Sequence, residues 1–234
     1  MLRIVPAGLL LATIVLLFGC SPATTSYNVR PPYDDANIPP GMRDTLWDDA
    51  ARLALNKEIA ADSSFIDSVT IPQDRIQFYY TDLVKLYNVQ RIPARDSIFG
   101  LYRVQPIEPE LHLVVAYGPG FFENLSDSMK RQMEARFDLD SVPYAPVRLH
   151  SRVPCNAIAL AKEMQREFPN LLIDAEGYGS TGGCFSDIYV SDSVDSRFYT
   201  YRYCLENAGY HDWYFSVDDS GRVLYRGSDG DPIR

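Results

Sequence analysis

The sequence predicts an α+β fold in which about four helices pack on one face of a largely antiparallel sheet that ends in a C-terminal β-meander. Apolar residues recur at helical spacing in several stretches of the first two thirds of the chain. Short alternating stretches separated by turn sequences fill residues 183–226. A helix that is apolar on one side needs a partner for that side, and a sheet face supplies it.

Four stretches carry the helical pattern. In the first, Leu46, Ala50 and Leu53 recur on one face. Pro72 suits the first position of the second helix, where its missing N–H is not needed. Ser126 is a helix-capping residue before the third. The predicted helices are residues 43–61, 72–87, 126–137 and a last one from Pro154 or Asn156 to Phe168.

Strands are predicted between and after these helices. Residues 110–117 alternate, with Leu113, Val115 and Tyr117 on one side and His112 and Val114 on the other. Asp, Ser, Asn and Gly clusters separate the strands of the C-terminal meander. The predicted strands are residues 97–105, 110–117, 144–150, 171–176, 183–190, 197–205, 211–217 and 222–226.

The meander carries an aromatic face. If its first hairpin is centred on Val194, the aromatic side chains of the second strand share one side with Phe185 and Tyr189. The helices need such a face for their core, which is the favoured interpretation. The alternative is an open platform for sugar rings or for a protein partner. The possible ligand-binding residues on it are Tyr199, Tyr201, Tyr203 and Trp213.

The N-terminus has the layout of a secretory signal. Arg3 precedes an uninterrupted apolar run that stops at Gly19, directly before Cys20. The run falls short of the roughly 20 apolar residues that a membrane span needs. An ordinary cleaved signal and a retained helix are the alternatives. The last four residues, Leu17-Phe18-Gly19-Cys20, resemble the lipobox of bacterial lipoproteins.

That resemblance, which covers residues 1–21, implies a location and a membrane partner. Residues 1–19 would be removed as a signal peptide, and Cys20 would carry a diacylglycerol and a fatty acid such as palmitate. Ser21, in place of the Asp that retains such proteins at the inner membrane, implies the outer membrane. Residues 20–41 are rich in Pro and read as a tether. Residues 42–234 are expected to form a single α+β domain.

Charge and motif spacing exclude several functions. A net charge of −9 disfavours nucleic acid as a partner. The histidines lack the spacing of a zinc site, so no metal is expected. Residues 177–182 match the glycine pattern of dinucleotide sites, but a strand follows where such a site needs a helix. No cofactor is therefore predicted.

The cysteines predict a disulfide. In an oxidising compartment thiols tend to pair, and Cys184 and Cys204 are symmetric about Val194, which would place them opposite one another. Cys155 paired with either of them, or no bridge, are the alternatives. Left unpaired, Cys155 would be a small buried hydrophobe or, with His150, a weak candidate for a catalytic nucleophile.

Paired carboxylates are another weak candidate for catalysis. Asp174 and Glu176 would share one side of their strand, as an acid and a base for glycoside cleavage must, yet that side is expected to face water. The sequence therefore favours a lipid-anchored envelope protein without catalysis. The alternatives are a lipoprotein that binds glycan, peptidoglycan or an envelope protein through the aromatic face, and a thiol- or carboxylate-dependent hydrolase.

Overall fold

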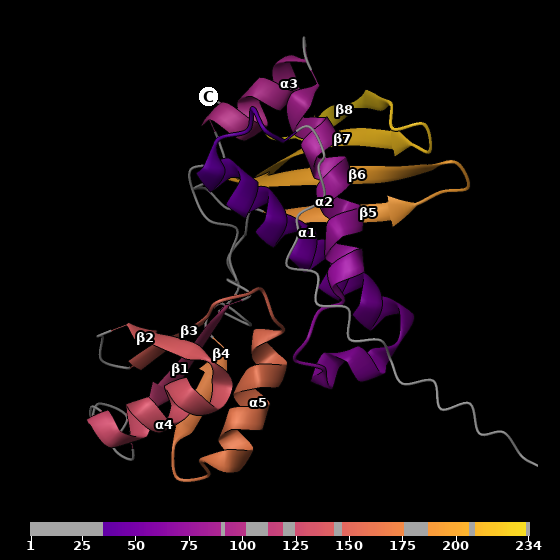
Figure 1. Ribbon diagram of the computed structural model, residues 1–234. Helices are drawn as coiled ribbons and strands as arrows, with labels where there is room; N and C mark the ends of the chain where they lie inside the picture. The colour runs from indigo at the N-terminus through magenta and orange to yellow at the C-terminus, as the bar shows by residue number, and fades with distance from the viewer. Residues whose placement is uncertain are drawn as a thin grey trace, which may run out of the picture.

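The computed structural model describes residues 35–89, 92–101, 112–118, 125–142, 147–175, 187–205 and 209–232. The α+β prediction is confirmed, with helices and two antiparallel sheets of four strands each. The sequence predicts helices against one largely antiparallel sheet, whereas the strands divide between two sheets that each have their own hydrophobic core. Figure 1 shows these two parts of the molecule.

The meander lobe contains two helices and the C-terminal sheet. Helices α1 (Pro40–Ala61) and α2 (Gln73–Asn88) lie across one face of that sheet (Figure 1). Pro40 stands in the first turn of α1, where the helix needs no N–H donor. The sheet has the order β5-β6-β7-β8, and its strands are β5 (Asp187–Asp192), β6 (Ser196–Cys204), β7 (Tyr210–Asp218) and β8 (Val223–Gly230).

The inserted lobe lies between α2 and β5 in the sequence. Its elements follow a β-α-β-β-α-β order with sheet order β2-β3-β1-β4, which is the ferredoxin-like arrangement. Met133, Leu149 and Met164 are fully buried in its core. The elements are β1 (Leu113–Tyr117), α4 (Asp127–Phe137), β2 (Leu139–Val142), β3 (Val147–Ser151), α5 (Ala157–Glu167) and β4 (Leu172–Ala175).

Local capping explains why α4 and α5 begin where the sequence predicts. The hydroxyl of Ser126 accepts a hydrogen bond from the Met129 N–H at 3.3 Å. The side chain of Asn156 accepts one from the Ala159 N–H at 3.3 Å. In both cases a side chain satisfies a donor that the first helical turn leaves free.

The strand predicted at 97–105 is wrong in its described part. Residues Pro93–Asp96 form the short helix α3, and Ser97–Leu101 continue it as a π-helical turn. The buried side chain of Ile98 joins the core of the meander lobe, so tertiary packing overrides the local strand pattern. Strand β2 was missed because it is only four residues long and follows α4 directly.

The register of the first meander hairpin is one residue away from the prediction. Val190 pairs with Tyr199 and Ile188 with Tyr201, so the turn is centred between Val194 and Asp195. A shift of one residue moves every side chain of a strand to the other face. Ile188, and not Tyr189, therefore joins the inner face that α1 and α2 cover.

The two lobes meet at the loop after α1. Thr70 forms a β-bridge with Cys155. The side-chain amide of Asn156 donates to the carbonyls of Phe65 and Ile66 at 3.3 and 3.1 Å. Because Asn156 also caps α5, this one buried side chain fixes both the start of that helix and the junction between the lobes.

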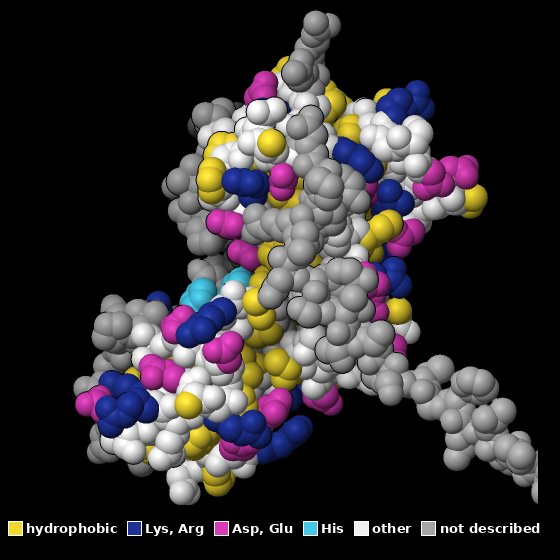
Figure 2. All heavy atoms as spheres, viewed as in Figure 1, with side chains coloured by type: hydrophobic (Ala, Val, Ile, Leu, Met, Phe, Trp, Pro, Cys, Tyr) yellow, Lys and Arg dark blue, Asp and Glu magenta, His cyan; other side chains and the backbone are white. Residues whose placement is uncertain are grey.

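Histidine adds polar contacts to the same junction, and Figure 2 shows histidine side chains on the surface between the lobes. His112 places Nε2 3.1 Å from the Asp48 carboxylate on α1 and Nδ1 3.2 Å from the Ser151 carbonyl. The ring of His150 stacks on that of His112, with centroids 5.3 Å apart. These contacts tie β1 and β3 to α1.

Candidate binding face of the meander sheet

The aromatic residues that the sequence singled out lie inside the protein. Tyr199 is 0% exposed, and Tyr201 and Trp213 are each 5% exposed. Tyr203 packs against the same core. The core interpretation of this face is therefore confirmed, and an open platform made of these four residues does not fit their burial.

A buried acid anchors this inner face to α2. Asp82 accepts hydrogen bonds from the Arg197 guanidinium at 2.6 Å and from the Tyr199 hydroxyl at 2.8 Å. Lys85 adds a contact at 3.1 Å. Burial and the nearby carboxylate both raise the pKa of Tyr199, so its hydroxyl stays a donor. The cluster holds helix to sheet and has the character of a structural site.

The opposite face of the sheet, which we call the outer face, is turned away from α1 and α2. It carries Tyr189, Phe198 and Tyr210, which are 42%, 37% and 45% exposed. The solvated face of an antiparallel sheet is normally polar. Exposed aromatic rings on such a face are therefore the feature that a folding role does not explain.

Arg202 is held between two of these rings. Its guanidinium lies 4.4 Å from the Tyr210 ring centre and 5.5 Å from that of Tyr189. Two hydrogen bonds of 2.9 and 2.8 Å join it to the carboxylate of Asp212, which raises the pKa of Arg202. The Arg202 guanidinium is thus held in a fixed position between the Tyr189 and Tyr210 rings by its contacts with Asp212.

A second arginine extends the outer face towards β8. Tyr214 pairs with Gly227 and Phe215 with Tyr225, so Arg226 is the extra residue of a β-bulge. Its guanidinium lies 5.9 Å from the Phe198 ring centre, and its Nε donates to the Ser216 hydroxyl at 2.9 Å. In the described residues no carboxylate pairs with Arg226.

The outer face combines rings for stacking with fixed hydrogen-bonding groups. Aromatic rings offer flat apolar surfaces, while the guanidinium groups of Arg202 and Arg226 supply donors to hydroxyl groups. The sequence analysis missed Arg202 and Arg226 because it considered only the side of β6 and β7 that carries Tyr199, Tyr201, Tyr203 and Trp213. One signal was present: in β6, Phe198 and Tyr199 are adjacent, which puts aromatic rings on both faces of the strand.

The candidate thiol nucleophile is not activated. The thiol of Cys155 is 5% exposed, and burial raises its pKa to about 11. Only the thiolate is an effective nucleophile, so such a group is unreactive near neutral pH. The ring of His150 stacks on His112, and Cys155 lies in the bridge to Thr70. These positions suit a structural role at the junction.

Asp174 is exposed, as the sequence predicts, and its carboxylate accepts the N–H of Ala175 at 2.8 Å. Cys204 is the last residue of β6. Cys204 is disulfide-bonded, and its predicted pairing with Cys184, which lies outside the described residues, stays a prediction. Glu176, the glycine pattern at 177–182, Cys184 and the lipobox with Cys20 lie outside the described residues.

Within the ranges that the structure describes, no three His, Cys, Asp or Glu side chains are grouped so that they could hold a metal ion. No helix in those ranges combines the length and apolar character needed to cross a membrane. Comparisons with protein-family models, with curated proteins and with solved structures find no match to this chain.

Proposed function

We propose that this protein is a non-catalytic, lipid-anchored protein of the bacterial outer membrane that binds glycan through the outer face of its meander sheet. Cys20 at the end of an apolar signal supports the anchor, and the Pro-rich stretch after it supports a tether. Peptidoglycan is the glycan polymer that such a location places within reach.

The exposed aromatic residues of the outer face carry the binding part of this proposal. Tyr189, Thr200 and Tyr214 are direct neighbours across three strands. Neighbouring strands are about 4.8 Å apart, so this row is about 10 Å wide. A flat strip of that width is comparable to one or two sugar rings and suits a polymer chain better than a deep pocket would.

Co-sedimentation with peptidoglycan and titration with chitotetraose test the binding role. Replacing Tyr189 or Tyr210 by alanine should weaken binding about tenfold, which corresponds to about 1.4 kcal/mol per ring. Phe78→Ala is the matched control, because Phe78 is 41% exposed but lies on α2. Equal affinity of both tyrosine variants and the unsubstituted protein for both glycans would overturn the binding role.

A separate experiment tests the anchor. Cells fed labelled palmitate should label the unsubstituted protein, and Cys20→Ala should abolish both the label and the recovery with the outer-membrane fraction. If the Cys20→Ala protein keeps its fatty acid, the anchor is wrong, whatever the outcome of the glycan experiment.

A further inference from the structure

The outer face of the meander sheet presents one exposed arginine whose charge the fold leaves open. Arg226 donates through Nε to the hydroxyl of Ser216, a residue that is 1% exposed. In the described ranges its terminal nitrogens have no hydrogen-bond or ion-pair partner. Arg202 on the same face, in contrast, places both Nε and Nη2 on the carboxylate of Asp212. The terminal nitrogens of Arg226 can therefore bind a ligand carboxylate through two parallel hydrogen bonds.

A β-bulge turns Arg226 towards this face. Phe215 pairs with Tyr225, and the next pair joins Tyr214 to Gly227. Gly227 has a φ of 118°, a backbone conformation that favours glycine. No heavy atom other than its chain neighbours lies within 4 Å of the position that a Cβ would take there. The bulge thus directs Arg226 outwards and leaves open space beside Tyr214, and bulges of this kind are frequent next to functional sites.

Charge is unequally distributed along the outer face. On one side of the proposed sugar row, the residues paired across the four strands are mostly acidic: Asp187, Arg202, Asp212 and Asp229. On the other side, the residues paired across the strands are uncharged: Ser191, Phe198, Ser216 and Leu224. Arg226 adds its positive charge to this second side. A negatively charged group on a bound sugar is therefore favoured beside Phe198 and disfavoured beside Asp212.

Arg226 lies within reach of a sugar bound on the row of Tyr189, Thr200 and Tyr214. Phe198 is two residues from Thr200 along β6, a separation of about 7 Å. The Arg226 guanidinium lies 5.9 Å from the Phe198 ring centre. A pyranose ring with a carboxylate substituent spans a comparable length, so one sugar can contact the row and Arg226 together.

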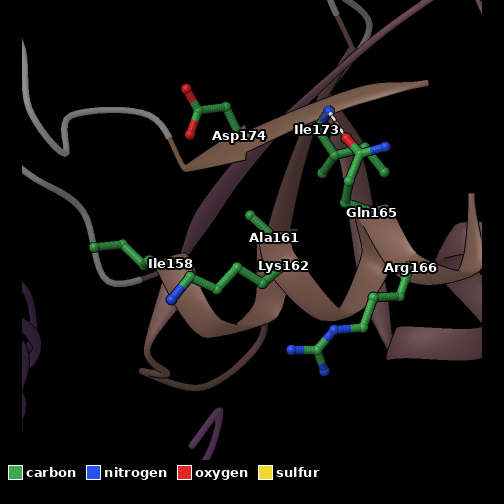
Figure 3. Close-up of a pocket in the computed structure, with 7 residues that line it drawn as sticks. All are labelled: Ile158, Ala161, Lys162, Gln165, Arg166, Ile173 and Asp174. Atoms are coloured by element: carbon green, nitrogen blue, oxygen red, sulfur yellow. Dashed lines mark hydrogen bonds between the residues drawn. The ribbon is translucent and has the colours of Figure 1, made fainter. Parts of the chain in front are cut away.

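The pocket on α5 of the inserted lobe, with a volume of about 350 Å³, lacks such an open group. Figure 3 shows Gln165 at its wall, where Oε1 accepts the Ile173 N–H at 2.8 Å. Lys162, which also lines the pocket, pairs with Asp67 at 2.9 Å. These polar groups are engaged within the fold, whereas the terminal nitrogens of Arg226 face outwards.

We infer that the outer face binds glycan at a sugar that carries a free carboxylate, and that Arg226 pairs with this carboxylate. N-acetylmuramic acid has such a group wherever no peptide is attached to it. The inference rests on the proposed glycan binding and adds an acidic sugar as the ligand class. At physiological salt, exposed charges more than about 8 Å apart are largely screened, so the net charge of −9 spread over the chain does not prevent this local pairing.

Isothermal titration of the full chain in detergent with two tetrasaccharides tests this inference. One alternates N-acetylglucosamine with peptide-free N-acetylmuramic acid. The other is chitotetraose, which has the same sugar backbone without carboxylates. The acidic tetrasaccharide should bind about tenfold more tightly, the gain of about one charge-assisted pair. Arg226→Gln should abolish this preference and leave the affinity for chitotetraose unchanged.

Arg131→Gln is the matched control, because it removes the same charge from an exposed position on α4, and it should leave both affinities unchanged. Equal binding of the two tetrasaccharides, or an equal loss for both in Arg226→Gln, would overturn the acidic-sugar inference while glycan binding stands. Loss of the preference in Arg131→Gln as well would assign it to net charge and also overturn the inference. Absence of binding to either tetrasaccharide would overturn the proposed function together with it.

Discussion

Replacing Asp82 by alanine tests whether the buried acid cluster holds the meander lobe together. Asp82 is 2% exposed, and its removal leaves the Arg197 guanidinium and the buried Tyr199 hydroxyl without their carboxylate. Breaking a buried ion pair by removing one partner costs about 3–5 kcal/mol. For a protein of this size the loss corresponds to a melting temperature lower by about 6–20 °C.

Tryptophan fluorescence is the appropriate assay. Both tryptophans of the chain, Trp47 and Trp213, belong to the core of the meander lobe, so their emission follows the unfolding of that lobe. The control is Asp192→Ala, which removes an ion pair with Lys57 of 2.7 Å on an acid whose side chain is 55% exposed. Exposed pairs contribute only about 0–1 kcal/mol. Equal melting temperatures for the Asp82 and Asp192 variants would refute the structural role of the cluster.

Three further predictions concern the junction and the cores. Asn156→Ala should lower the free energy of unfolding by about 2 kcal/mol, because α5 loses its cap and the carbonyls of Phe65 and Ile66 lose a donor. Urea titration measures this free energy, and a loss under about 0.5 kcal/mol would contradict the prediction. Burial raises the pKa of Tyr79 from 10.0 to about 12. The contribution of this hydroxyl to the free energy of unfolding should therefore be constant below pH 10 and fall by roughly 2–3 kcal/mol as the pH rises to 12. Tyr79→Phe should remove that part of the decline, and an equally steep decline in the variant counts against it. The pKa of the Cys155 thiol is raised from 9.0 to about 11, so its thiolate fraction is about 100-fold smaller than that of a cysteine in solution. Labelling with a disulfide reagent at pH 8 should therefore become fast only when the protein unfolds. Fast labelling of the folded protein would contradict the burial of this thiol.

Local signals were sufficient for most helices. Pro72, Ser126 and Asn156 stand where the sequence predicts helices to begin, and the structure confirms all three starts within a residue or two. These signals work because a cap or an N-terminal proline acts on backbone groups a few residues away. The four meander strands were predictable for a similar reason, since alternation and turn residues are local patterns.

Side-chain direction in the sheets was not predictable from the same patterns. In β1 the core side consists of Val114 and Ala116, while Val115, on the other side, is also buried. In the first meander hairpin the Ser193 N–H donates to the Ser196 carbonyl, which gives a two-residue loop at Val194 and Asp195. A three-residue loop centred on Val194 fits the sequence equally well, and only the paired strands decide between them.

The sequence by itself determined the α+β class, the helix starts, the C-terminal meander and the expectation of a lipid anchor at Cys20, because each depends on residues that are close together in the chain. Tertiary structure decided that the strands form two sheets, that Tyr199 and Trp213 are core, and that Tyr189 and Tyr210 face outwards. These features depend on contacts between distant residues, and a single step in strand register is enough to exchange a buried face for an exposed one.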